Sequence, residues 1–92
     1  MEEAKLQDMV FKLLEPGIYK TTAQVVEEFR MEYPEAWRQL EKEGEMLFGS
    51  SCSSVQQPVT RISRVLFSLP TDRCFSRRNQ NVYRWSKNPA FK

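Results

Sequence analysis

The sequence predicts a mostly helical α+β fold within a single domain, residues 1–92. Four stretches place apolar side chains at the spacing of an amphipathic helix, and two short runs rich in aromatic and β-branched residues follow them. A chain of 92 residues builds one compact core, and an apolar content of 40% is enough to fold it. We therefore expect one core that is formed mainly by helices.

The first expected helix covers residues 2–14, whose apolar side chains share one broad stripe at about 100° per residue. Pro16 and Gly17 end this helix, because proline cannot continue the hydrogen-bond ladder and glycine readily leaves it. Ile18 to Lys20 is then expected to form a short extended segment. The stripe is formed by Leu6, Met9, Val10, Leu13 and Leu14.

Two further helices are divided by a proline. The second expected helix begins at Thr21 or Thr22, because either threonine can act as its N-cap. Pro34 interrupts this helix and suits the first turn of a new one, where its missing N–H costs little. We therefore expect an additional helix over residues 34–48, which Gly49 ends.

The fourth expected helix covers residues 54–69, with Pro58 in its first turn. One arc of this helix is apolar and is expected to enter the core, as are Trp37 and Trp85. Phe67 lies at the edge of the arc, where it packs against the additional helix or forms a dimer contact. The opposite face stays available to solvent or to a ligand. The arc consists of Val59, Ile62, Val65, Leu66 and Leu69.

The two C-terminal runs, residues 73–77 and 82–86, predict a β-hairpin. We expect a three-residue loop, Asn79 to Asn81, because this register places the aromatic side chains on one face. Such a loop needs one residue in the left-handed conformation, which Asn81 tolerates. The shared face would hold Phe75, Arg77, Tyr83 and Trp85.

The charges are divided unevenly between the two halves of the chain. Residues 1–48 hold eleven acidic and six basic side chains, which leaves a charge of −5. Residues 49–92 hold eight basic side chains and one acidic residue, Asp72, which leaves +7. Such an asymmetry points to a polyanionic partner for the basic half.

The sequence gives no sign of an enzyme, a metal site or a cofactor. The chain has no histidine, and Cys52 and Cys74 alone cannot build a zinc site, so we expect two ordinary thiols. Glycine-rich phosphate loops and nucleophile motifs are absent from the sequence. The carboxylates within residues 27–45 do not converge on one helix face, so we interpret them as solvated side chains.

The sequence also has no segment that suggests membrane insertion or export. No apolar stretch approaches the roughly 20 residues that a membrane-spanning helix needs. The N-terminus opens with acidic residues rather than the basic region of a signal peptide. We expect a cytoplasmic protein, or a nuclear one if the source is eukaryotic.

The predicted order of elements resembles the winged helix-turn-helix superfamily, in which three helices pack together and a C-terminal hairpin forms the wing. The resemblance covers nearly the whole chain and implies that residues 54–69 are the recognition helix and residues 73–86 the wing. Ile18 to Lys20 would complete a small sheet, and the additional helix after Pro34 departs from the simplest pattern. Two segments carry the resemblance: Val59-Thr60-Arg61-Ile62-Ser63-Arg64-Val65-Leu66 and Val82-Tyr83-Arg84-Trp85.

The resemblance and the charge pattern both point to duplex DNA. A major groove about 12 Å wide admits one helix that buries one face in its own core and presents polar and basic groups on the other. Arginines on that face and at the hairpin tip would bind phosphates or guanine edges. The expected contact residues are Gln56, Gln57, Thr60, Arg61, Ser63, Arg64, Arg77, Arg78, Asn79 and Arg84.

We therefore expect a small transcriptional regulator or accessory factor that binds duplex DNA. Two alternatives stay open: a protein-interaction module that uses the acidic face of residues 27–45, and a binder of RNA or single-stranded DNA. In the last case Tyr83 or Tyr19 would stack with bases. A homodimer also stays open, because one short helix reads few bases alone.

Overall fold

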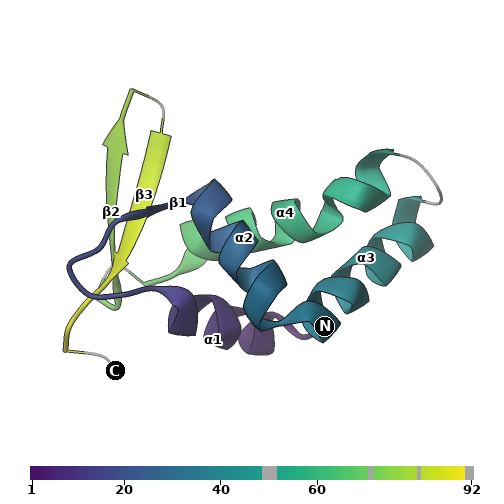
Figure 1. Cartoon of the computed structure of the whole chain (residues 1–92), viewed down its shortest axis with the longest axis horizontal. Helices are drawn as coiled ribbons and strands as arrows, with labels where there is room; N and C mark the ends of the chain where they lie inside the picture. The colour runs from purple at the N-terminus through teal and green to yellow at the C-terminus, as the bar shows by residue number, and fades with distance from the viewer. Residues whose placement is uncertain (49–51, 71, 81, 91–92) are drawn as a thin grey trace.

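The sheet and the helices follow the order that the sequence predicts. The computed structural model describes residues 1–48, 52–70, 72–80 and 82–90. Within these ranges the chain forms four helices and a three-stranded antiparallel sheet, which confirms a mostly helical α+β fold (Figure 1). The elements are α1 (Glu3–Leu13), β1 (Lys20–Thr21), α2 (Thr22–Glu32), α3 (Pro34–Phe48), α4 (Cys52–Ser68), β2 (Cys74–Asn79) and β3 (Val82–Lys87).

The connection from α1 to α2 is fixed by a glycine and a capping box. Gly17 has a φ of 78°, a left-handed conformation that glycine adopts without steric cost. Thr21 is the N-cap of α2: its Oγ1 accepts a hydrogen bond from the Gln24 N–H at 3.2 Å. The Gln24 side chain in turn accepts the Thr21 N–H at 2.8 Å. Of the two threonines expected as N-cap, Thr21 is therefore confirmed.

The α3 and α4 helices lie side by side: α3 runs away from the sheet and α4 runs back toward it (Figure 1). The bounds of α3 are those expected from the sequence. The α4 helix begins at Cys52, two residues before the expected start, and Pro58 therefore lies inside the helix rather than in its first turn. A proline at this position removes one backbone hydrogen bond.

The register of the hairpin differs from the expected one. Asn79 pairs with Val82, which leaves a two-residue loop in place of the expected three. Phe75 and Arg77 therefore lie on one face, while Tyr83 and Trp85 lie on the other. The left-handed residue that the structure describes is Gln80, with a φ of 50°, whereas Asn81 lies outside the described residues.

The burial of Trp85 explains this register. Trp85 is 2% exposed and lies directly opposite Ser76 in the sheet. The small Ser76 side chain leaves room for the indole ring against α4, whereas the expected register would have paired Trp85 with Phe75. The strand order is β1-β3-β2, so β3 is central and carries Trp85 into the core.

The core joins all four helices to the sheet, and one expected member is missing from it. Val59 is 41% exposed, so its assignment to the core was wrong. Near its N-terminal end α4 packs against α3, and there the buried arc centres on Pro58 instead. Trp37 and Leu69, which were also expected in the core, are only partly buried against it. The buried hydrophobic residues are Leu6, Val10, Leu14, Val25, Phe29, Ala36, Leu40, Ile62, Val65, Leu66, Cys74 and Trp85.

None of the helices in the described ranges combines the length and the apolar character that crossing a lipid bilayer requires.

Candidate nucleic-acid interface

Arg61 does not face outward, contrary to the sequence-based prediction. Its side chain is 15% exposed and points toward α1 and α3. The guanidinium donates to the Met1 carbonyl at 3.2 Å and to Glu3 at 3.4 Å, and it lies 3.7 Å from Glu43. The two carboxylates and the carbonyl draw this cation inward, so Arg61 ties α4 to the helices around it.

Fewer of the predicted contact residues of α4 face outward than the sequence suggested. Gln57 is 8% exposed and belongs to the buried side, because it adjoins Pro58 where α4 meets α3. The Gln56 side chain lies outside the described residues. Thr60 and Arg64 are exposed and Ser63 is partly exposed, one helical turn apart on the same side. Among the described residues, no carboxylate forms a salt bridge with Arg64.

Phe67 continues this outward face toward the hairpin. It is 57% exposed, yet its ring meets Tyr83 and Trp85 edge-on, with centroids 4.8 and 5.2 Å apart. Phe67 therefore packs against the inner face of the hairpin and not against the additional helix. The Arg78 guanidinium lies 5.7 Å from the centre of the Tyr83 ring. A continuous surface thus runs from Thr60 and Arg64 across Phe67 to Arg78, and we call it the α4 surface.

The other face of the sheet, which we call the outer sheet face, carries the remaining arginines of the hairpin. Arg77 lies directly opposite Arg84 across the two strands. The Arg77 guanidinium also reaches over β3 to the Tyr19 ring, 4.4 Å from its centre. Phe75 and Val82 add exposed apolar surface at 42% and 41% exposure. This face consists of Tyr19, Thr21, Phe75, Arg77, Asn79, Val82, Arg84 and Ser86.

The predicted contact residues therefore fall on two surfaces instead of one. Thr60, Ser63, Arg64 and Arg78 belong to the α4 surface, while Arg77, Asn79 and Arg84 belong to the outer sheet face. Neighbouring residues of a strand point to opposite faces, so Arg77 and Arg78 separate. The sequence-based prediction missed Phe67 and Phe75 as exposed aromatic members of these surfaces.

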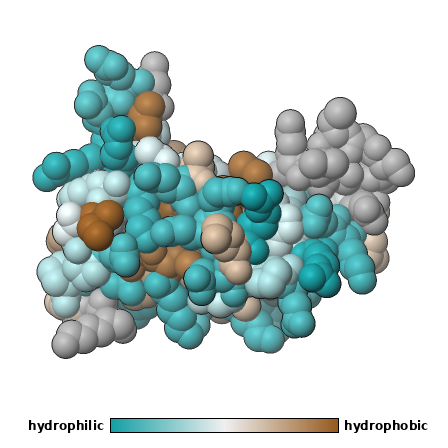
Figure 2. Space-filling model, viewed as in Figure 1, coloured by the Kyte–Doolittle hydropathy of each residue, from teal (hydrophilic) through white to brown (hydrophobic). Residues whose placement is uncertain are grey.

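The tip of the hairpin projects beyond the helices (Figure 1). Figure 2 shows that the protruding part is mostly hydrophilic, with one small hydrophobic spot.

The basic half also contains a buried thiol, Cys74, which is 5% exposed and forms no disulfide. Burial raises the pKa of Cys74 to about 11, so this thiol stays protonated near neutral pH and is a poor nucleophile.

The acidic half satisfies much of its charge internally. Glu27 pairs with Arg30, and Glu43 pairs with Arg61. Glu28 binds Lys20, which is 7% exposed, with oxygens at 2.9 and 3.0 Å from the Lys20 Nζ. The acidic face of residues 27–45 thus offers less free charge to a basic partner than the sequence suggests.

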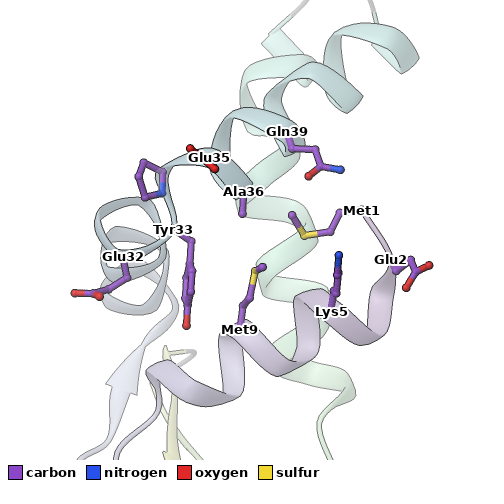
Figure 3. A pocket seen from close by; sticks show the side chains of 10 residues that line it. Met1, Glu2, Lys5, Met9, Glu32, Tyr33, Glu35, Ala36 and Gln39 are labelled. Atoms are coloured by element: carbon purple, nitrogen blue, oxygen red, sulfur yellow. The ribbon is translucent and has the colours of Figure 1, made fainter.

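A hollow of about 860 Å³ lies on this acidic side, between α1 and the junction of α2 with α3. Met1, Met9 and Tyr33 point into it, and so does the cationic Lys5 (Figure 3). Glu32 lines the rim and points away. This mixture of apolar side chains, an inward cation and rim carboxylates selects no single class of ligand.

No protein-family model, curated protein or solved structure matches the chain.

Proposed function

We propose that the chain is a winged-helix module that binds duplex DNA, as a small transcriptional regulator or accessory factor of the cytoplasm or nucleus. The order of helices and strands and the sheet order β1-β3-β2 support this layout, with α4 as the recognition helix and β2–β3 as the wing. The observation that carries the proposal is the charge of the exposed elements. Arginines project from α4 and the hairpin, while Asp72 is the one acidic residue between residues 49 and 92.

The α4 surface supplies the groove contact in this proposal. Arg64 offers a fork of donors to a phosphate or a guanine edge, and Thr60 and Ser63 donate hydrogen bonds beside it. Arg78 extends the positive charge from the helix to the wing. Arg61 is left out of the interface, because its guanidinium is already held by Glu3 and Glu43.

Salt-dependent titrations with a duplex test the proposal. A fluorescently labelled random-sequence DNA duplex is titrated with the protein at several salt concentrations between 50 and 200 mM. Binding should weaken steeply with salt, because released counterions drive phosphate contacts. Arg64→Ala should weaken binding several-fold and lower the log–log salt slope by about 0.9, the value for one lost phosphate contact.

Arg38→Ala is the matched control, since Arg38 is an exposed arginine on α3, away from the proposed interface. This variant should bind like the unmodified protein. The proposal is wrong if the protein does not retain duplex DNA at low salt, or if Arg38→Ala weakens binding as much as Arg64→Ala.

A further inference from the structure

The outer sheet face carries two arginines whose like charges do not stabilise the sheet. Arg77 and Arg84 are direct cross-strand partners. Directly opposed residues of an antiparallel pair bring their Cβ atoms within about 5.5 Å, and like charges at this spacing destabilise the pairing. An anion bound between the two guanidiniums would convert this repulsion into attraction. The pair therefore points to an anionic ligand on this face.

Aromatic side chains flank the two arginines. Arg77 stacks on Tyr19 at 4.4 Å, so its planar guanidinium lies against a ring and presents its other side to a ligand. Phe75 lies two residues from Arg77 on the same face and is 42% exposed. The outer sheet face has no acidic member. Planar apolar surface interleaved with arginine is the chemistry that binds nucleobases and phosphates together.

The spacing of the stacking groups distinguishes single strands from duplexes. Phe75 and Arg77 are separated by about 6.8 Å along the strand, twice the rise of one residue. The Arg77 guanidinium is also displaced sideways from Phe75, because it reaches across β3 to Tyr19. Bases in duplex DNA are separated by about 3.4 Å along each strand. Two neighbouring bases can therefore stack on Phe75 and Arg77 only if they are drawn apart, as in an extended single strand.

We infer that the outer sheet face binds single-stranded nucleic acid. Phe75 and the Tyr19–Arg77 pair stack on unpaired bases, and Arg84 binds the backbone phosphate between them. This surface lies on the side of the hairpin that faces away from α4. It is therefore independent of the proposed duplex contact, and either can fail without the other.

Titration of single strands that lack stable secondary structure tests the inference. Labelled 20-nucleotide oligothymidine and oligouridine are titrated separately at 50 mM salt, so that the two arms distinguish DNA from RNA. Phe75→Leu should weaken binding of the preferred strand about tenfold, because an aliphatic side chain keeps the apolar surface but not the stacking. Phe75→Tyr should retain affinity within about twofold.

Two controls separate this inference from the duplex proposal. Arg64→Ala should weaken binding of the duplex and leave oligothymidine binding unchanged, while Phe75→Leu should do the reverse. Thermal melting verifies that each variant folds. The inference is overturned if neither oligonucleotide binds, or if Phe75→Leu binds both single strands as tightly as the unmodified protein.

Discussion

Replacing Arg61 with alanine separates two roles for this arginine, a DNA contact and a bridge within the fold. The structure supports the bridge, since the side chain is 15% exposed and joins Glu3 of α1 to Glu43 of α3. We therefore expect Arg61→Ala to lower stability and to leave the affinity of the folded protein for duplex DNA nearly unchanged.

The size of this loss follows from the surroundings of each partner. Glu3 is 50% exposed, so its ion pair with Arg61 contributes about 0–1 kcal/mol. Glu43 is 28% exposed, and its Oε2 is buried with no hydrogen-bond partner among the described residues. The Glu43 Oε1 also pairs with the Met1 ammonium, so Arg61→Ala leaves this carboxylate one cation and costs about 1 kcal/mol there. The total of about 1–2 kcal/mol should lower the Tm by about 4–16 °C in a domain of this size.

Thermal unfolding followed by circular dichroism measures this change. Arg64→Ala is the matched control, because Arg64 lies on the same helix but is exposed, and its removal should change stability by less than about 0.5 kcal/mol. The reasoning fails if Arg61→Ala melts like the unmodified protein and loses affinity for duplex DNA. That result would favour the outward Arg61 that the sequence pattern predicts.

Three further predictions concern the fold. Thr21→Ala should destabilise the protein by about 1 kcal/mol in urea unfolding, because it removes the cap of α2, whereas Thr22→Ala should cost less. Gln80→Gly should stabilise the protein by about 0.5–1 kcal/mol in the same assay, because Gln80 has a φ of 50°. The pKa of Cys74 rises from 9.0 to about 11 on folding, so the unfolded thiol loses its proton first. The free energy of unfolding should therefore fall as pH rises from about 9 to about 11, and this fall should be smaller in Cys74→Ala.

The helices could be predicted because their limits depend on local chemistry. Pro34 begins α3 at the position that the sequence predicts, because the missing N–H of proline costs little in the first turn of a helix. Thr21 caps α2 through a contact with Gln24, three residues away. Such interactions span a single turn, so they can be recognised from the residue pattern alone.

The fate of the charged side chains could not be predicted in this way. Arg61 meets Glu3 across 58 positions of the sequence, and only the packing of α4 against α1 brings the two together. Helical periodicity places Arg61 beside the apolar arc, but it does not predict whether a carboxylate of another helix lies next to it. Arg61 was therefore predicted on the correct helix but with the wrong orientation.

The hairpin register shows that packing in the core determines which side chains share the outer sheet face. The expected three-residue loop would have paired Arg84 with Ser76. Arg77 and Arg84 would then have lain on opposite faces of the sheet, because successive side chains of a strand alternate between faces. The observed register sets Arg84 opposite Arg77, a like-charge pair that costs about 0.2–1 kcal/mol. It also buries Trp85, and an aromatic ring that buries about 150–250 Å² contributes about 4–6 kcal/mol at about 25 cal/mol per Å². The second term is several times the first, so the core fixes the register and the repulsion persists on the outer sheet face. A polyanion bound there would remove this repulsion, so a pair that is unfavourable for folding would favour the binding that we infer for this face.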